Sequence, residues 1–231
     1  MDCSYLEGNL KNLKEEIKRV SDVCGRNAGE ILLMPAVKYA DAEQINYIHS
    51  LGVNDIGENR VQQLLEHLTG LDTTGLNIHF IGSLQTNKVK YIIDKVCLIH
   101  SLDSDRLAFE IDKQAKKHGI VMRVLVEINS GSEESKGGVA PENAEEFCLE
   151  IQKYRNIRLC GFMTMAPKCA DRSMYHKYFS QTRELCDKIW YGTLKKTERP
   201  ILSMGMSDSF REAIAEGSTL IRVGSTIFKK Q

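Results

Sequence analysis

Short apolar segments alternate with amphipathic segments along most of the chain. Eight apolar runs are too short for buried helices and predict buried strands, at residues 31–37, 53–56, 77–81, 96–100, 121–128, 158–162, 201–204 and 220–223. The segments between them repeat with helical spacing, and the first segment carries a single apolar stripe made of Leu6, Leu10, Leu13, Ile17 and Val20. About eight strand–helix repeats after an extra N-terminal helix predict an α/β protein with a closed (β/α)₈ barrel.

Capping residues indicate where several of the predicted helices begin and end. Asp41 and Ser104 are expected to cap helices, and Gly52 and Gly119 are expected to end them. An open doubly wound sheet is the competing architecture, but no G-x-G-x-x-G motif follows the first strand. No linker or low-complexity tract divides the chain, so we expect a single domain over residues 1–231.

Composition narrows the function classes. Lys plus Arg and Asp plus Glu both total 31, and this neutral balance argues against nucleic acid as a main partner. No apolar run is long enough to span a membrane, and the N-terminal segment lacks the features of a signal peptide. The seven cysteines include no C-x-x-C pair, which favours reduced thiols in a cytoplasmic protein over a metal site.

Lys38 is the first candidate for chemistry, because it directly follows the first apolar strand. A barrel would place it at the carboxyl ends of the strands, where this fold gathers its active sites. Partial desolvation there would disfavour the ammonium and make the amine a better nucleophile towards an aldehyde. The alternative, favoured by the lysine alone, is an ammonium that reaches out of the barrel mouth into water.

Two glycine-containing loops near the C-terminus indicate a phosphate site. Gly205 and Ser207 follow the seventh predicted strand, with Ser207 expected to cap the next helix, and Gly224 and Ser225 follow the eighth. Barrels recurrently bind phosphate with these two loops. Glycine lets the backbone approach the oxygens, and serine donates a hydrogen bond. Each glycine alone would merely indicate a turn, whereas the two loops together favour phosphate.

Arg222 belongs to the last apolar strand, so we expect its guanidinium to be buried and to face inward. A buried guanidinium needs a partner. That partner is either a carboxylate, with Glu58 and Glu127 as candidates, or a heteroaromatic nitrogen of a ligand.

Three further polar residues have simpler interpretations. Asn59 follows the second strand and either contacts a ligand or caps the next helix, and the cap is the simpler interpretation. His79 and His100 lie within strands, where a lone histidine is more often a core residue than a catalyst. Residues 129–138 form a polar, glycine-rich loop that is a candidate lid.

Eight segments together resemble the pyridoxal phosphate homeostasis protein family, single-domain relatives of the alanine racemase barrel. They occur in the family's order: AVKYADAEQI, IGENRVQ, HFIGSLQTNKVKY, LIHSLDS, EESKGGVAP, GFMTM, LSMGMSDSFREAI and EGSTLIRVGSTIF. Each segment is weak evidence alone, and the set is highly specific.

The resemblance implies pyridoxal 5′-phosphate (PLP) as the cofactor, held as a Schiff base on Lys38. It implies that Arg222 faces the pyridine nitrogen, that Asn59 lines the pocket, and that the phosphate is held by Ser207, Gly224 and Ser225. Family members are generally regarded as regulators of vitamin B6 and amino-acid pools. They are often monomeric and have no established turnover, so the resemblance implies no catalytic residue and no metal, and it offers apo-PLP enzymes as partners.

The chain departs from the family pattern at three places. Tyr39, Ala40 and Asp41 stand where Thr-Lys-Pro is common, so no role of that second lysine can be transferred. Ser83 replaces a frequent histidine. Ser225 replaces a frequent threonine but keeps its hydroxyl, so phosphate binding should survive.

A PLP-dependent racemase or decarboxylase of the same lineage is the alternative to a carrier, and a Schiff-base aldolase that binds a sugar phosphate is a third hypothesis. Racemisation needs two acid/base groups on opposite faces of the cofactor. In this lineage the second group comes from a β-domain after the barrel, which we expect to be missing because the chain ends at Gln231. A guanidinium on the pyridine nitrogen would also leave the ring a weak electron sink. Both arguments favour the carrier.

Overall fold

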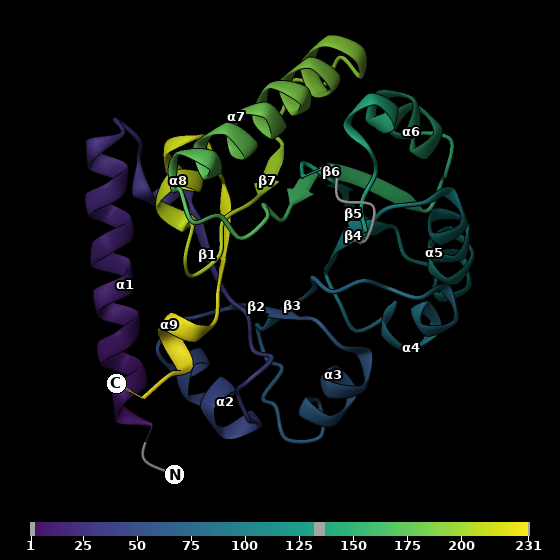
Figure 1. Cartoon of the computed structure of the whole chain (residues 1–231). Helices are drawn as coiled ribbons and strands as arrows, with labels where there is room; N and C mark the ends of the chain where they lie inside the picture. Colours follow the sequence, from purple (N-terminus) through teal and green to yellow (C-terminus); the bar gives the residue numbers. More distant parts are fainter. Residues whose placement is uncertain (1–2, 132–136, 231) are drawn as a thin grey trace.

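A computed structural model describes residues 3–131 and 137–230 of the chain. Eight parallel strands form a barrel with helices around it, which confirms the predicted (β/α)₈ fold (Figure 1). The strands are β1 (Leu32–Pro35), β2 (Asp55–Glu58), β3 (Asn77–Phe80), β4 (Leu98–Leu102), β5 (Met122–Ile128), β6 (Ile157–Thr164), β7 (Ile201–Ser203) and β8 (Leu220–Val223).

The barrel closes between its first two strands. Hydrogen-bonded neighbours run in the order β1-β8-β7-β6-β5-β4-β3-β2. A parallel bridge between Ala36 and Gly57 joins the ends of this sheet, and the Val37 N–H donates to the Gly57 carbonyl over 3.1 Å. A Cβ at Gly57 would lie 2.9 Å from the end of the Met34 side chain, so a larger residue at this seam would require that side chain to shift.

Nine α-helices occur in the described residues, and the first is the predicted N-terminal helix. They are α1 (Ser4–Val23), α2 (Ala42–Ser50), α3 (Val61–His67), α4 (Val89–Ile92), α5 (Asp105–His118), α6 (Ala144–Ile151), α7 (Ser173–Asp187), α8 (Phe210–Ala215) and α9 (Ser225–Phe228).

The predicted helix ends are largely confirmed. The Asp41 side chain accepts from the Gln44 N–H in a capping box, and Gly119 ends α5 with a left-handed φ of 66°. Ser104 occupies the N-cap position of α5 but makes no capping bond, because its hydroxyl donates to Asp103.

Several boundaries differ from the prediction by a few residues, and the structure explains two of these differences. Residue 53 was expected to open the second strand, but the Val53 N–H donates to the Ile48 carbonyl and completes the turn after α2, so β2 begins at Asp55. The helix expected at 173–191 becomes a π-helix over Lys188–Thr193. Within this wider turn Trp190 packs edge-on against Phe162, with ring centroids 6.4 Å apart.

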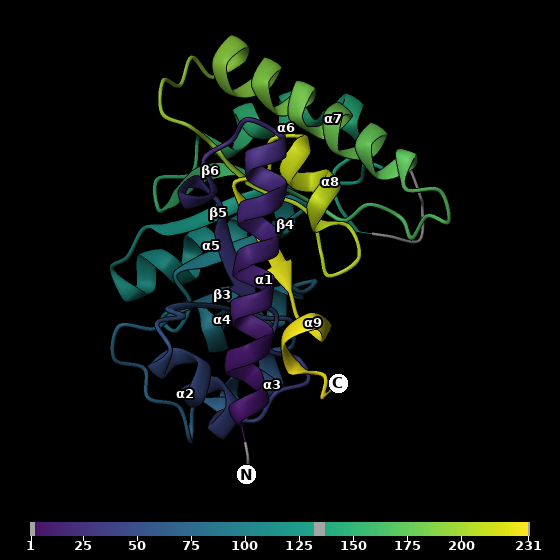
Figure 2. The same ribbon diagram turned by 90° about the vertical axis from the view of Figure 1, so that its left-hand side faces the viewer.

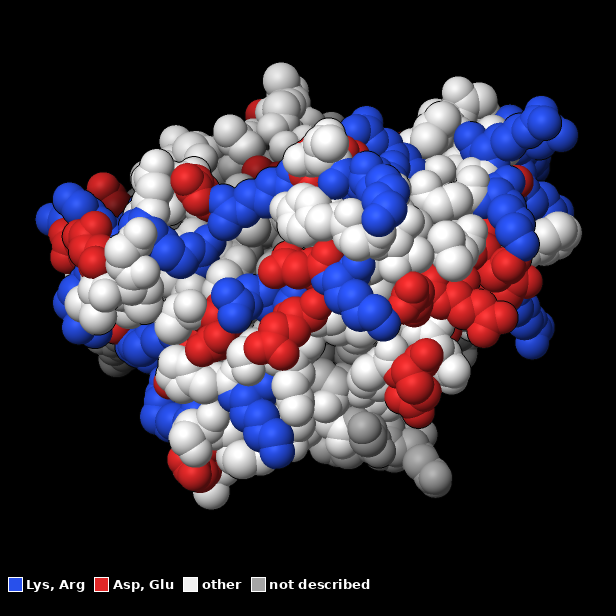
Figure 3. Space-filling model, turned by 90° about the horizontal axis from the view of Figure 1, so that it is seen from above, with Lys and Arg blue, Asp and Glu red and all other residues white. Residues whose placement is uncertain are grey.

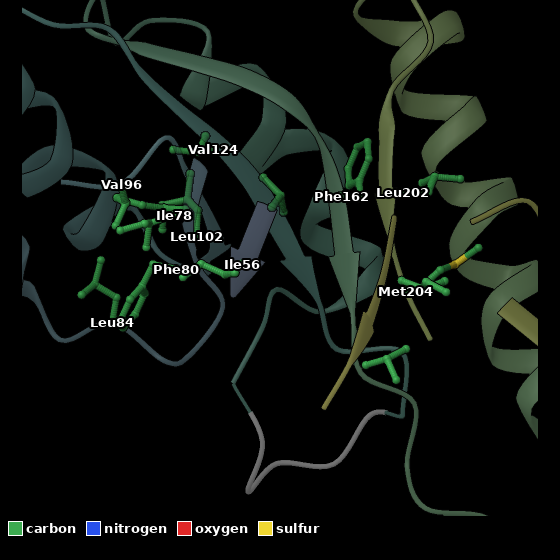
Figure 4. Close-up of a cluster of buried hydrophobic side chains, with 14 of the residues drawn as sticks. Ile56, Ile78, Phe80, Leu84, Val96, Leu102, Val124, Phe162, Leu202 and Met204 are labelled. Carbon is green, nitrogen blue, oxygen red and sulfur yellow. The ribbon is translucent and has the colours of Figure 1, made fainter. Parts of the chain in front are cut away.

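Most of the apolar core lies between the strands and the surrounding helices. Figure 4 shows part of it, with labelled side chains Ile56, Ile78, Phe80, Leu84, Val96, Leu102, Val124, Phe162, Leu202 and Met204. A small separate cluster of buried apolar residues, Leu98, Leu125 and Met163, lies apart from this core. The barrel interior therefore keeps room for polar side chains.

Helix α1, at the start of the described chain, packs against the helices near its C-terminal end. It lies beside α8 and α9 in both ribbon views (Figures 1 and 2). The buried Asn9 amide donates to the carbonyls of Ile227 and Lys229 over 2.9 and 3.1 Å. This N-terminal helix therefore fixes the segment that follows β8.

The surface gives little evidence for one dominant charge. Positive and negative side chains are interspersed on the face seen from above (Figure 3). In the part of the chain that the structure describes, no helix is both long and apolar enough to cross a bilayer.

Candidate functional site

Three of the predicted site segments meet at the carboxyl ends of β1, β2 and β8. The Ala36 N–H donates to the Val223 carbonyl over 3.0 Å, one residue before Gly224. A Cβ on Gly224 would lie 2.8 Å from the Ala36 carbonyl oxygen, so only glycine allows this close approach. With the bridge from Ala36 to Gly57, the chain leading to Lys38 runs between the segments that carry Asn59 and Gly224.

Lys38 lies at this mouth with its side chain exposed. Its Nζ lies 4.9 Å from the centroid of the Tyr39 ring. The expected partial desolvation is therefore wrong, and the alternative of an ammonium that reaches water describes the structure better. Its backbone is fixed, because the Gln63 side chain donates to the Lys38 carbonyl over 2.9 Å. The amine is accessible to a ligand at a defined position of the rim.

Asn59 does not cap a helix. Helix α3 begins at Val61, and Arg60 occupies its N-cap position. The Asn59 Oδ1 is buried without a hydrogen-bond partner. Its backbone packs directly against Gly82, where an added Cβ would lie 2.0 Å from the Asn59 carbonyl oxygen. An orphaned buried acceptor costs about 1–3 kcal/mol, so this amide favours the interpretation as a ligand contact.

Ser207 also fails as a helix cap. Helix α8 begins at Phe210 with Ser209 at the N-cap position, and the Met206 N–H donates to the Ser209 hydroxyl over 3.2 Å. Ser207 is half-buried and lines a cavity of about 220 Å³ together with Thr226, which follows Ser225. Of the predicted phosphate residues only Ser207 lines this cavity, since Gly224 and Ser225 are not among its lining residues, and α1 forms another of its walls.

Arg222 is buried and faces inward, as predicted, but its partners are not carboxylates. Its Nη1 donates to the Ser203 carbonyl over 2.6 Å and to the Ser203 Oγ over 2.7 Å, and its Nη2 donates to the Thr164 carbonyl over 2.9 Å. Burial lowers the pKa of Arg222 to about 10, and the attraction of Glu127 opposes that shift. The guanidinium therefore remains charged at neutral pH.

Glu58, one of the two predicted carboxylate partners, binds a histidine instead. Its Oε1 lies 2.5 Å from Nδ1 of His67, and the other ring nitrogen lies 3.1 Å from the Ala40 carbonyl. Burial raises the pKa of Glu58, while the bond to His67 opposes the shift. This pair ties β2 and α3 to the turn that follows Lys38.

The sequence interpretation missed a histidine pair inside the barrel. His79 Nδ1 lies 3.0 Å from His100 Nε2, and both side chains are buried. Each histidine is the third residue of its strand, and β3 and β4 are neighbours. This shared position in consecutive strands was the signal that could have revealed the pair.

The candidate lid predicted at residues 129–138 lies partly outside the described part of the chain, because residues 132–136 are not described.

Comparison with known proteins agrees with this geometry. Residues 8–231 match the family described as alanine racemase, N-terminal domain. A pyridoxal phosphate homeostasis protein from Aquifex aeolicus is 42% identical over 219 residues, which is 95% of both chains. The chain belongs to the pyridoxal phosphate homeostasis protein family. Two solved structures extend the similarity.

A Bifidobacterium adolescentis protein described as unknown superposes with a TM-score of 0.90 and 32% identity, covering 98% of this chain and 95% of its own. PipY of Synechococcus elongatus, solved with PLP bound, has a TM-score of 0.81 and 26% identity, with 92% and 99% coverage. Family membership thus rests on nearly the full length of the described barrel.

Proposed function

We propose that this protein binds PLP as a Schiff base on Lys38 and keeps intracellular PLP and amino-acid pools in balance without catalytic turnover. One observation carries the proposal: an exposed primary amine follows β1, and a buried, oriented guanidinium lies on the neighbouring strand β8. Met34 pairs with Arg222 in the register of β1 and β8, and Lys38 follows four residues beyond Met34. Membership of the family, with one relative solved with PLP, supports this ligand.

The residues at the barrel mouth fit PLP. The first N–H groups of a helix lack intrahelical partners, so the backbone at Gly224 and Ser225 can donate to phosphate oxygens, with the hydroxyls of Ser225 and Ser207 adding to them. Asn59 contributes its orphaned amide. When bound, PLP supplies an aldehyde that condenses with a primary amine, and Lys38 offers an accessible one.

Arg222 supports a carrier more than a racemase or decarboxylase. Three hydrogen bonds to Ser203 and Thr164 orient the guanidinium and leave N–H groups for a pyridine nitrogen. Because the guanidinium holds its protons at neutral pH, the ring nitrogen stays unprotonated and withdraws electrons weakly. We extend the proposal to a cytoplasmic, monomeric protein of one domain over residues 1–231, with apo-PLP enzymes as acceptors.

The experiment is spectroscopic. The purified protein should be yellow, with about one PLP per chain, and borohydride should change its absorbance. Lys38→Ala should lose the absorbance, and normal absorbance and stoichiometry in that variant would refute the attachment.

A matched pair of variants tests the proposed role of Ser207 in binding the phosphate. Ser207→Ala should release PLP faster than the wild type, whereas Ser50→Ala, at an exposed hydroxyl on α2, should not. Equal retention in both variants would remove Ser207 from the site. Sustained turnover of any L-amino acid by the pure protein would overturn the non-catalytic assignment.

A further inference from the structure

A continuous chain of hydrogen bonds crosses the barrel interior from one mouth towards the other. Asp55 Oδ1 lies 3.0 Å from His79 Nε2, and His79 Nδ1 lies 3.0 Å from His100 Nε2. His100 Nδ1 then lies 2.9 Å from Ser203 Oγ, which accepts from Arg222 Nη1. Five residues from β2, β3, β4, β7 and β8 therefore form one path.

The Asp55 end of this path opens to solvent. A cavity of about 300 Å³ lies at the amino ends of the strands, and the first residues of five strands line it: Leu32, Asp55, Asn77, Ile201 and Leu220. The side chain of Asp55 is 20% exposed, and His79 also lines the cavity. His100, Ser203 and Arg222 lie deeper and are buried. A solvent proton can therefore reach the chain at His79, at the mouth opposite Lys38.

The chemistry of the partners fixes the direction of each bond when both rings are neutral. A carboxylate only accepts, so His79 must donate to Asp55 from Nε2–H. Its Nδ1 is then an acceptor and receives the Nε2–H of His100. The Nδ1 of His100 is in turn an acceptor and receives the Ser203 hydroxyl proton. Every hydrogen points towards Asp55, and the Ser203 oxygen presents its lone pairs to Arg222.

Protonation of His79 reverses two of these bonds. The imidazolium donates from both nitrogens, so its Nδ1–H must point at His100 Nε2. If His100 stays neutral, its proton then lies on Nδ1 and points at Ser203. The Ser203 oxygen becomes the acceptor of two donors, and its own hydroxyl proton is displaced from His100.

The charged groups around the rings favour a neutral His100 in both states. Burial lowers the pKa of His100 well below its usual value, and His79, Arg222 on β8 and Arg123 on β5 add to the effect. Asp55 on β2 faces His79 from the other side. The cavity beside His79 is also lined by the ion pair of Glu30 and Arg199, by Arg123 and by Cys97. The chain thus holds a carboxylate at its solvent end and a guanidinium at its buried end.

We propose that His79 and His100 form a proton-responsive relay that positions Arg222 from the opposite mouth of the barrel. A proton taken up from the amino-end cavity changes the hydrogen-bonding state of Ser203 and so the hold on Arg222. The two histidines and Ser203 are positioning residues, since they act through Arg222. The relay does not depend on the identity of the ligand at the carboxyl-end mouth.

The test uses nitrogen-15 NMR of the histidine side chains in protein without PLP, between pH 8 and pH 5. At pH 8 both rings should be neutral with the proton on Nε2. As the pH falls, uptake of one proton by the chain should leave both nitrogens of His79 protonated and the proton of the neutral His100 on Nδ1, in the same step. A His100 ring that keeps its tautomer while the chain takes up that proton would overturn the relay, and so would two rings that never change.

The link to Arg222 is measured by hydrogen exchange of its guanidinium protons across the same pH range. In the wild type the intrinsic pH dependence should carry an extra step at the pH where the tautomer of His100 changes. Ser203→Ala should remove that step and accelerate exchange by about two- to fivefold. Ser50→Ala serves as the control and should change neither. A step that persists in Ser203→Ala would show that Arg222 does not respond through Ser203. Because no ligand is present, failure here leaves the PLP proposal intact, and an absent yellow colour leaves this proposal intact.

Discussion

Replacing Glu127 by glutamine should stabilise the fold, and the gain should increase as the pH rises. Glu127 lies on β5, facing the barrel interior, and is only 6% exposed. Burial, with a smaller contribution from Asp103, raises its pKa from 4.5 to about 7, and the attraction of Arg222 only partly opposes this. Glutamine fills nearly the same space without the charge.

The size of this pH-dependent stability change follows from the pKa shift of Glu127. The folded state binds the Glu127 proton more tightly than the unfolded chain, so it holds more protons between pH 4.5 and 7. Wild-type stability therefore falls across this window and levels off above it. At about 1.4 kcal/mol per pKa unit, the Glu127 contribution falls by about 2 to 3 kcal/mol between pH 5 and pH 8.

Urea denaturation of the PLP-free protein, followed through Trp190, the only tryptophan in the sequence, measures the effect. The free energy of unfolding of Glu127→Gln relative to the wild type should rise by that amount from pH 5 to pH 8. Glu142→Gln, at an exposed glutamate, should show a flat difference. A difference for Glu127→Gln that is constant or falls with pH would refute the reasoning.

Two further substitutions test the frame of the site. His67→Ala should lower the free energy of unfolding by about 3 kcal/mol, because it leaves the buried Glu58 without its partner, and a loss below 1 kcal/mol in urea denaturation would contradict that role. Gly224→Ala should cost about 1–3 kcal/mol and accelerate PLP release, because its Cβ would lie 2.8 Å from the Ala36 carbonyl; an unchanged melting temperature together with unchanged retention would contradict the close approach.

The fold was predictable because its signals are local. The run at 220–223 coincides with β8, since its apolar residues are bounded by Gly217 and Gly224. The Asp41 capping box is likewise a matter of a few residues. Periodicity and caps of this kind act within one element, so the sequence carries them directly.

The partners across the barrel were less predictable. Arg222 was expected to bind either a carboxylate, with Glu58 and Glu127 as candidates, or a ligand nitrogen. The carboxylate alternative is wrong, because the Arg222 donors meet the Ser203 hydroxyl and two backbone carbonyls. Which side chains meet inside a barrel depends on the registers of all strands, and the pattern along one strand does not contain that information. The pairing of two histidines from neighbouring strands was missed for the same reason.

The loops of the candidate site could be predicted only in part. The two loops predicted to bind phosphate do follow the last two strands, but Ser207 and Ser209 compete for one cap. The backbone decides between them: Gly205 adopts a φ of 93° and packs against Phe210, which delays the start of α8 until after Ser209. Likewise, exposure of Lys38 depends on the rim around it, which no property of the strand before it reveals.

Mapping the attachment site of PLP tests the central claim most directly. The PLP-loaded protein is reduced with borohydride and digested, and the modified peptide is identified by mass spectrometry. The account predicts a single phosphopyridoxyl group on Lys38 at about one per chain, and none in Lys38→Ala. A label on another lysine, or a yellow protein whose Lys38 peptide stays unmodified after reduction, would contradict it.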